Sequence, residues 1–265
     1  MYSGSLKKMT VSLGEKVKYT LMLNEPVDMN ALIGSRLQFD WNGQIICTSC
    51  GKNTNKSFGD GFCYPCFSSA PDAAECIIRP ELCRAHLGEG RDPDWEEKHH
   101  NVTHIVYLAA TDAVKVGVTR ATQVPTRWID QGAAQAIILA ETPNRYEAGM
   151  LEVALKDFFT DKTNWQRMLK NETDDTIDLV DEKWRLHDEL PSDLTTYFSE
   201  EDDVVSLNYP VEMYPEKVKS IGLEKTPTFN AVLKGIRGQY LIFEGGMVMN
   251  IRKHTGYTVQ LTVAE

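Results

Sequence analysis

Five polar residues in the middle of the chain have types and spacings that suit the cleavage of a phosphodiester bond. They are Tyr107, Lys115, Arg127, Glu152 and Asn164. An arginine can bind two phosphate oxygens at once, and a glutamate can hold a divalent ion. A tyrosine can take up a proton near neutral pH only if a neighbouring cation such as Lys115 or a metal lowers its pKa. Each residue also has an ordinary structural interpretation, as a core-edge aromatic, a solvated helix residue or a cation stacked on a tryptophan.

The segments that carry these residues have recognisable patterns. Residues 105–108 and 114–118 are short apolar alternations that predict two paired strands, with a loop at 110–113 between them. The alternation places Tyr107 and Lys115 off the apolar stripe. Residues 144–159 have a helix-like pattern that contains Glu152. We therefore expect a hairpin followed by helices to bring these polar groups together.

The order and spacing of these residues resemble the GIY-YIG nuclease superfamily over residues 102–165. Tyr107 stands in the position of the first tripeptide's tyrosine, and Lys115 replaces the tyrosine of the second, as in branches whose second strand reads Val-Lys-Ile-Gly. The resemblance implies that Arg127 is the helix-borne arginine, Glu152 the glutamate that binds a divalent ion, and Asn164 the late asparagine. It implies a small α/β unit that cleaves DNA or RNA with Mg²⁺ or Mn²⁺, a hydrolase of the endonuclease type. The alternative is a non-catalytic, zinc-dependent module that keeps this fold to bind nucleic acid or a protein partner.

The six cysteines are confined to a short segment upstream of the predicted hairpin. Cys47 and Cys50 form one pair, and Cys63 and Cys66 form another, each with two residues between its cysteines. This spacing predicts a tetrahedral zinc site that stabilises a stretch too short and polar to fold by hydrophobic burial. Four thiolates leave no open coordination position, so this zinc would be structural. Two disulfide bonds are the alternative, which the lack of a secretory signal disfavours.

A second set of metal-binding side chains follows directly. Cys76, Cys83 and His86 offer three ligands, and His99 and His100 lie just before the predicted hairpin. The chain is similar to a divergent zinc-binding family of uncharacterised bacterial proteins, and that resemblance implies His100 as the fourth ligand of a second zinc. Buried free cysteines beside a histidine pair in a loop are the alternative.

Composition limits the classes of function. The 265-residue chain carries a net charge of −10, which argues against a nucleic-acid-binding protein unless a local basic surface exists. Arg237, Arg252 and Lys253, with Tyr240 and Tyr257 for base stacking, are candidates for such a surface, and an ordinary solvent-facing surface is the alternative. The sequence has no apolar run long enough for a membrane span, so we expect a cytoplasmic protein.

We expect an α+β fold in five parts. They are a β-rich segment at 1–46, a zinc module at 47–100, a GIY-YIG-like unit at 101–170, an acidic helical connector at 171–203 and a β-rich segment at 204–265. The two β-rich ends could pair with each other into one small barrel that encloses the inserted modules.

Overall fold

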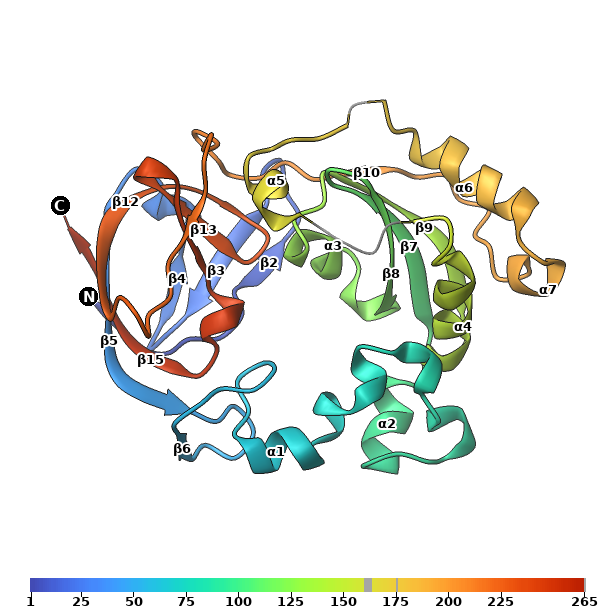
Figure 1. Ribbon diagram of the computed structural model, residues 1–265, viewed down its shortest axis with the longest axis horizontal. Coiled ribbons are helices and arrows are strands. Elements are labelled where there is room, and N and C mark those ends of the chain that lie inside the picture. The colour runs from blue at the N-terminus through green and yellow to red at the C-terminus, as the bar shows by residue number, and fades with distance from the viewer. Residues whose placement is uncertain (160–163, 175, 265) are drawn as a thin grey trace.

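The computed structural model describes residues 1–159, 164–174 and 176–264 of the chain. The fold is mixed α+β, as predicted, with three sheets in the described part of the chain. Figure 1 shows the strands of the two chain ends on the left, a second sheet with its helices on the right, and the cysteine-rich segment joining the two below. The three regions therefore face a common centre.

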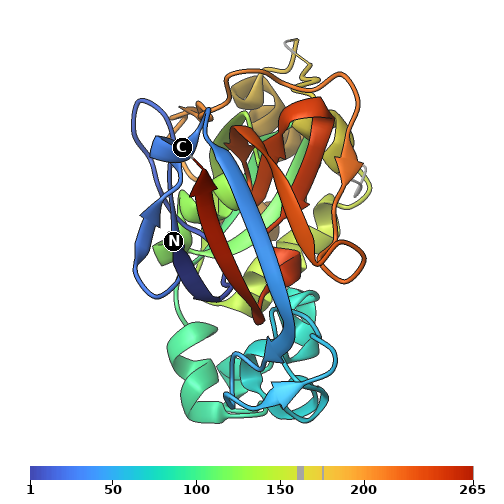
Figure 2. The ribbon, with the colours of Figure 1, turned by 90° about the vertical axis from the view of Figure 1, so that its left-hand side faces the viewer.

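The largest sheet has eight strands and is built from both ends of the chain. In spatial order its strands are β1 (Tyr2–Ser5), β15 (Tyr257–Ala264), β5 (Arg36–Ile46), β12 (Thr228–Arg237), β13 (Tyr240–Phe243), β14 (Met247–Asn250) and β11 (Lys219–Ser220), with β6 (Asn53–Thr54) paired to the end of β5. Figure 2 shows the long strand β5 beside β15, which comes from the other end of the chain. The predicted pairing of the two ends is confirmed. The barrel is not, because β1 and β11 remain two separate edges in the described part of the chain.

A small sheet covers the inner side of this large one. It consists of β2 (Thr10–Ser12), β3 (Lys18–Met22) and β4 (Pro26–Asp28), followed by a 3-10 helix, η1 (Asn30–Leu32). Alternation in β3 buries Tyr19 and Leu21, and β5 likewise buries Leu37 and Phe39. These side chains meet in the main hydrophobic core.

The second sheet holds the predicted hairpin. Its strands, in order, are β10 (Val205–Ser206), β9 (Gln135–Thr142), β7 (His104–Ala110) and β8 (Val114–Arg120). Its helices are α3 (Thr126–Asp130), α4 (Arg145–Leu155), α6 (Leu179–Glu189) and α7 (Ser192–Thr195), with the 3-10 helix η6 (Ala121–Gln123) after β8. Central strand β7 is buried on both faces. Val106 and Leu108 on one face pack in the core beneath α4 and α6, while Ile105 and Tyr107 on the other face join the main core.

The cysteine-rich segment consists of short helical turns. These are α1 (Tyr64–Ser69), the 3-10 helices η2 (Pro71–Ala73), η3 (Glu75–Ile77), η4 (Pro80–Leu82) and η5 (Ala85–Leu87), and α2 (Pro93–His99). Its hydrophobic cluster is small and includes Cys76 and Cys83 themselves. Such a segment has little apolar surface to bury, which agrees with folding that depends on bound metal.

The acidic segment is anchored by one helix. In α6, Leu186 is fully buried, whereas Trp184 stays 39% exposed. Lys183 is also buried, and its Nζ donates to the carbonyl oxygen of Glu201 at 2.6 Å and to Asp202 at 3.0 Å.

The remaining elements are α5 (Trp165–Leu169) and two 3-10 helices, η7 (Glu244–Gly246) and η8 (Arg252–His254). No helix in the described part of the chain is long and apolar enough to cross a membrane. The five-part division of the chain stays a prediction.

Candidate functional site

Tyr107 lies across the hairpin from a glycine. β7 and β8 pair in a register that sets Tyr107 opposite Gly117. A Cβ atom at Gly117 would lie 2.5 Å from the Tyr107 hydroxyl and 2.6 Å from Cζ, so the ring occupies the space that any other residue would fill. The glycine therefore allows the tyrosine side chain to lie flat over its neighbouring strand.

The Tyr107 phenol is enclosed by its neighbours. It is 1% exposed, and its hydroxyl donates a hydrogen bond of 2.7 Å to the side-chain oxygen of Gln131. Its ring meets that of Trp128 edge-on at 6.0 Å. Burial raises the pKa of Tyr107, and the nearby Arg127 opposes this only in part. We expected a lowered pKa, whereas the pKa of the buried phenol is raised, and Arg127 is a cation whose charge opposes the rise.

Arg127 and Glu152 come from different helices, and both act electrostatically on Tyr107. Arg127 lies on α3 and Glu152 on α4. The charges of both residues act on the pKa of Tyr107, and both also act on the pKa of Arg145 at the start of α4. Three of the five predicted residues, Tyr107, Arg127 and Glu152, thus lie within electrostatic reach of one another.

The other two predicted residues have different positions. Lys115 lies on the same face of β8 as Gly117, two residues along the strand, with a buried Nζ. Asn164 is exposed and caps α5, where its Oδ1 accepts hydrogen bonds from the backbone N–H groups of Gln166 (3.1 Å) and Arg167 (3.3 Å). An asparagine just before a helix is a typical N-cap, so this local role was readable from the sequence. No interaction among the described residues joins Asn164 to Tyr107, Arg127 or Glu152.

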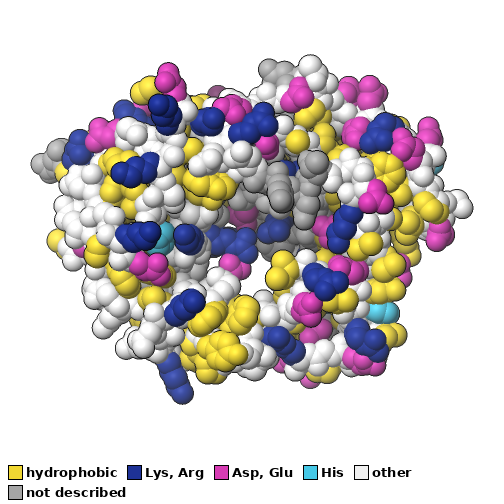
Figure 3. All heavy atoms as spheres, viewed as in Figure 1, with side chains coloured by type: hydrophobic (Ala, Val, Ile, Leu, Met, Phe, Trp, Pro, Cys, Tyr) yellow, Lys and Arg dark blue, Asp and Glu magenta, His cyan; other side chains and the backbone are white. Residues whose placement is uncertain are grey.

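Arg127 lines a basic cleft of about 760 Å³. Its charged lining comprises six Lys and Arg side chains and three Asp side chains, from all three regions of the molecule: Lys7, Lys8, Arg120, Arg127, Arg145, Arg252, Asp60, Asp72 and Asp130. Figure 3 shows Lys and Arg side chains around a hollow at the centre of the molecule. A chain with a net charge of −10 has concentrated positive charge at this place.

The basic side chains of the cleft differ in how they are paired. Arg252 forms two hydrogen bonds with the carboxylate of Asp60, at 2.8 and 2.7 Å, and Lys8 contacts Asp130 at 2.6 Å. Within the described part of the chain, Lys7 and Arg120 form no ion pair. A bound anion would meet these two cations without displacing a carboxylate.

The predicted nucleic-acid-binding surface needs correction. Arg237 is 1% exposed, because its guanidinium is enclosed by protein: Nε donates to the carbonyl oxygen of Gly132 at 3.0 Å and Nη1 donates to Asn171 at 2.5 Å. Arg252 does line the cleft, and Lys253 is exposed next to it on η8.

The two tyrosines proposed for base stacking are also occupied within the protein. Tyr240 stacks on Trp165 with a centroid distance of 5.7 Å and an interplanar angle of 3°. Tyr257 is 4% exposed, and its hydroxyl donates to Glu224 at 2.5 Å. Tyr257 therefore offers no open face, and one face of Tyr240 is covered by Trp165.

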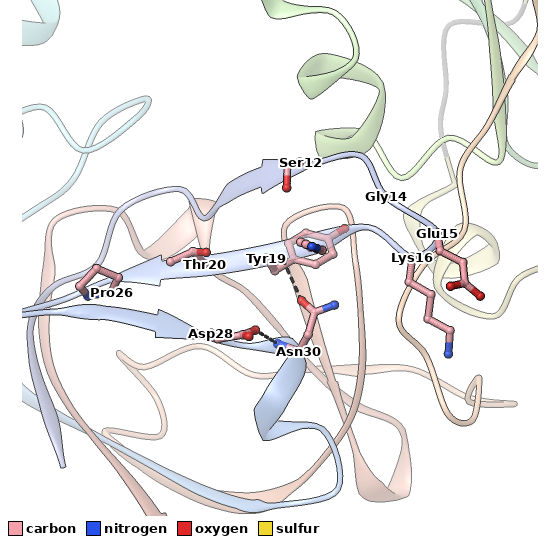
Figure 4. Close-up of a pocket in the computed structure, with 10 residues that line it drawn as sticks. Ser12, Gly14, Glu15, Lys16, Tyr19, Thr20, Pro26, Asp28 and Asn30 are labelled. Carbon is pink, nitrogen blue, oxygen red and sulfur yellow. Dashed lines mark hydrogen bonds between the residues drawn. The ribbon is translucent and has the colours of Figure 1, made fainter.

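Another cavity, of about 770 Å³, lies against the small sheet but has a different character. In Figure 4 its polar side chains come from β2 to β4 and the turns between them. Asn30 accepts a hydrogen bond from the backbone of Tyr19 at 2.8 Å, and Asp28 accepts one from the backbone of Asn30 at 2.9 Å. Asn30 thereby joins η1 to β3, and Asp28 stabilises the start of η1. The two cavities are nearly equal in size, so chemistry rather than volume favours the basic cleft.

The first cysteine quartet forms a compact cluster. The sulfur atoms of Cys47, Cys50, Cys63 and Cys66 all lie within 4.8 Å of one another, and all four cysteines are free. The distance between the sulfurs of Cys50 and Cys63 is 3.8 Å. Two thiolates on one tetrahedral zinc, each with a Zn–S bond of about 2.3 Å, would be about 3.8 Å apart.

Local hydrogen bonds prepare this cluster for a metal. Backbone N–H groups, among them that of Cys63 at 3.2 Å, point at the sulfur of Cys47. Burial alone would raise the pKa of Cys47, but these hydrogen bonds together lower it to about 6. The thiolate is the form that binds metal. The quartet therefore fits the predicted structural zinc.

The second cluster contains a ligand that the sequence prediction missed. Cys76, Cys83, Glu96 and His100 lie within 4.8 Å of one another, and all four are buried. Nδ1 of His100 is 3.9 Å from the sulfur of Cys76, 3.6 Å from that of Cys83 and 3.6 Å from Oε2 of Glu96. A nitrogen and a sulfur on one tetrahedral zinc would be about 3.6 Å apart.

Glu96 takes the place that we predicted for His86. His86 lies outside the cluster and stacks on Tyr146 at a centroid distance of 4.6 Å. Glu96 and His100 are four residues apart, which places both on one face at the end of α2. That spacing was a sequence signal for the fourth ligand. A buried carboxylate beside two thiols is costly unless a cation offsets its charge, and a divalent metal would do so.

The second cluster is docked on the helix that carries Glu152. Arg145 of α4 donates from Nε to the carbonyl oxygen of Cys76 and from Nη2 to that of Ile77, each at 2.8 Å. Its backbone N–H donates to the carbonyl oxygen of His100, also at 2.8 Å. One turn further on, Gly149 packs directly against the backbone of Pro80 and Glu81, where a Cβ atom would collide. The second metal cluster and Glu152 thus share one rigid support.

Comparison with known families shows to which family the chain belongs. Residues 34–259 match the family described as Protein of unknown function (DUF2797). The chain belongs to this family. The DUF2797 match takes in both cysteine clusters, the β7–β8 hairpin, Arg127 and Glu152. Neither the curated proteins nor the solved structures include a match to the chain.

Proposed function

We propose that this DUF2797 protein is a metal-dependent nuclease that cleaves phosphodiester bonds in DNA or RNA at the basic cleft. The observation that carries this proposal is that Arg127, whose charge acts on Tyr107 together with that of Glu152, lines a cleft with six Lys and Arg side chains in a chain of net charge −10. A surface of such local charge fits a polyanion. The resemblance to the GIY-YIG superfamily gives the same three residues a common purpose.

The side chains have distinct roles in this proposal. Arg127 lines the cleft, and its guanidinium binds the scissile phosphate through two parallel hydrogen bonds, which stabilises charge that develops on the phosphate oxygens. Tyr107 keeps its proton at neutral pH because burial raises its pKa. We therefore assign it as a positioning residue that holds Gln131 and Arg127 in place, in contrast to the base suggested by the sequence.

The donor set near the cleft suits a hard divalent cation. Glu152 is half-buried, and Mg²⁺ or Mn²⁺ is commonly held by one or two carboxylates together with several waters. Glu152 would hold the ion, which when bound would activate a water and stabilise charge on the phosphate. The sulfur-rich clusters favour zinc instead, so the two kinds of metal would occupy separate places.

The second candidate function is nucleic-acid binding without cleavage. It is favoured by the 1% exposure of Tyr107, which keeps the phenol away from a reacting water, and by Asn164, which caps a helix instead of joining the site. On this view the cleft binds the phosphate backbone, while the zinc clusters hold its walls in place.

The deciding experiment is a cleavage assay with zinc-loaded protein. Labelled single-stranded, double-stranded and branched DNA, together with structured RNA, is incubated with Mg²⁺ or Mn²⁺. The variants Arg127→Ala and Glu152→Gln are compared with matched controls, Arg185→Ala on α6 and Glu147→Gln on α4. We expect each site variant to lower the cleavage rate by about 100-fold or more, and the controls to retain it.

Three outcomes separate the candidates. Cleavage that is lost in both site variants supports the nuclease. Binding without cleavage, weakened by Arg127→Ala and unaffected by Glu152→Gln, supports the binding module. A protein of confirmed zinc content that neither binds nor cleaves any of these substrates overturns both.

A further inference from the structure

An aromatic pair on the wall of the basic cleft has no part in the proposed chemistry. Trp95 and His99 lie on consecutive turns of α2, and their rings stack with a centroid distance of 4.0 Å and an interplanar angle of 11°. Nδ1 of His99 donates to the carbonyl oxygen of Trp95 at 2.6 Å, which fixes the orientation of the imidazole. Both side chains line the cleft, and both are half-buried.

The position of this pair is set by the second metal cluster. Glu96 and His100, two of the cluster's four candidate ligands, lie on or next to the same short helix. The Trp95 ring also meets the His100 imidazole edge-on at 5.2 Å. A metal bound at the cluster would therefore hold α2 rigid, and with it the stacked rings of Trp95 and His99.

The same cleft supplies the charges that a phosphate backbone needs. Lys7 and Arg120 line it without ion pairs to described residues, and Arg127 lies on another of its walls. A chain of nucleotides offers alternating phosphates and flat bases, and proteins bind such strands with cations along the backbone and aromatic rings under the bases. A cleft that combines both kinds of group matches that alternation.

We infer that Trp95 and His99 form a base-stacking subsite, and that the ligand of the cleft is a single-stranded nucleic acid. This inference rests on the proposed function, since it assumes that the cleft binds nucleic acid. Bases within a duplex are already stacked on each other and their faces are inaccessible to a protein ring, whereas the bases of a single strand are open. The cleft volume of about 760 Å³ is also in the range of sites for small ligands, not of a groove that surrounds a duplex.

The test measures binding separately from cleavage. Zinc-loaded protein without added Mg²⁺ is titrated into a fluorescein-labelled single-stranded oligonucleotide and, separately, into its duplex with the complementary strand, and each dissociation constant is obtained from anisotropy. Trp95→Ala is compared with Trp95→Phe, which keeps an aromatic ring, and with Trp184→Ala, which removes a partly exposed tryptophan on α6 outside the cleft. We expect Trp95→Ala to weaken binding about tenfold or more, and the other two variants to bind nearly as the parent does.

A second arm uses the parent protein alone. Oligonucleotides of equal length and charge are compared in which one base at a time is replaced by an abasic site. We expect one or two positions at which the loss of the base weakens binding to the parent by about tenfold or more. This arm remains decisive even if Trp95→Ala loses its zinc.

The outcomes separate this inference from the proposal beneath it. Tight binding of the parent with no effect of Trp95→Ala or of any abasic position overturns the stacking subsite and leaves the nuclease proposal standing. Equal affinity for duplex and single strand overturns the single-stranded ligand. A parent that binds no nucleic acid overturns both the inference and the proposed function.

Discussion

The ring of Tyr107 lies over Gly117 on the neighbouring strand, so that the two positions share the space of one side chain. Gly117→Ala should therefore displace the tyrosine, because the new methyl group would lie 2.5 Å from its hydroxyl. We expect a loss of about 1–3 kcal/mol in the free energy of unfolding, measured by urea denaturation. In a Tyr107→Leu background the same substitution should cost much less, and equal costs in the two backgrounds would show that the tyrosine is not the obstacle.

Two substitutions test whether Glu96 or His86 is a ligand in the second cluster. Glu96→Gln should lower the zinc content after dialysis from two ions per chain to about one, because it removes a charged ligand from a buried cluster. His86→Ala should retain both ions, since His86 lies outside the cluster. Zinc is measured by mass spectrometry of the native protein. The reverse result would restore His86 as the ligand.

The contact between α4 and the metal-binding loop depends on Gly149. Gly149→Ala places a methyl group against the backbone of Pro80 and Glu81, which cannot rotate away as a side chain could. Alanine is by itself about 1 kcal/mol better than glycine within a helix, so a loss of stability here would come from the contact. We expect a net loss of about 1–3 kcal/mol and faster release of the second zinc to a chelator. Met150→Ala, at a partly exposed neighbouring position, is the control.

A buried histidine predicts how stability depends on pH. Burial, assisted by the charges of Arg145, His100 and Arg120, lowers the pKa of His104 from 6.5 to about 4. The folded protein therefore keeps His104 neutral in a range where the unfolded chain binds a proton. Stability should be fully present above pH 6.5 and fall by up to about 3 kcal/mol as the pH drops toward 4.

His104→Asn isolates this contribution. Asparagine can still donate to the carbonyl oxygen of Val102, as Nδ1 of His104 does at 2.7 Å, but it does not titrate. The free energy of unfolding is measured at several pH values between 7 and 4.5 for both proteins. Acid release of zinc affects both alike, so the difference between them should shrink as the pH falls. Parallel pH profiles of the two proteins would show that His104 does not cause the pH dependence of stability.

Local patterns in the sequence were sufficient for the hairpin and the first cysteine cluster. The alternation at 105–118 depends only on neighbouring residues, and two Cys-x-x-Cys pairs specify their own geometry whatever the surrounding fold. The pairing of β5 with β15 was also within reach, because both ends of the chain have strand patterns.

The sequence could not show which polar side chains are buried by tertiary packing. Arg237 was predicted to face solvent, but its guanidinium is hydrogen-bonded to Gly132 and Asn171 instead of to water. The rings of Tyr209 and Tyr214 also lie next to it. Glu96 was overlooked because a glutamate on a charged helix is usually solvated, and only the docking of the loop buries it. The basic cleft is lined by side chains from three distant regions of the chain. No local sequence pattern in this chain of net charge −10 could therefore predict it.

Strand β5 ends at Ile46, and the first cysteine of the candidate zinc cluster, Cys47, is the next residue. Its two flanking partners, β12 and β15, lie at the other end of the chain. During synthesis on the ribosome, the strand that leads into this cysteine cluster can pair early only with the short β6, and it must wait for both flanking strands until most of the remaining protein has emerged. Contacts so distant in sequence form slowly, and an exposed strand edge invites aggregation. Early capture of zinc at the four cysteines could hold the waiting segment in order before its neighbouring strands arrive.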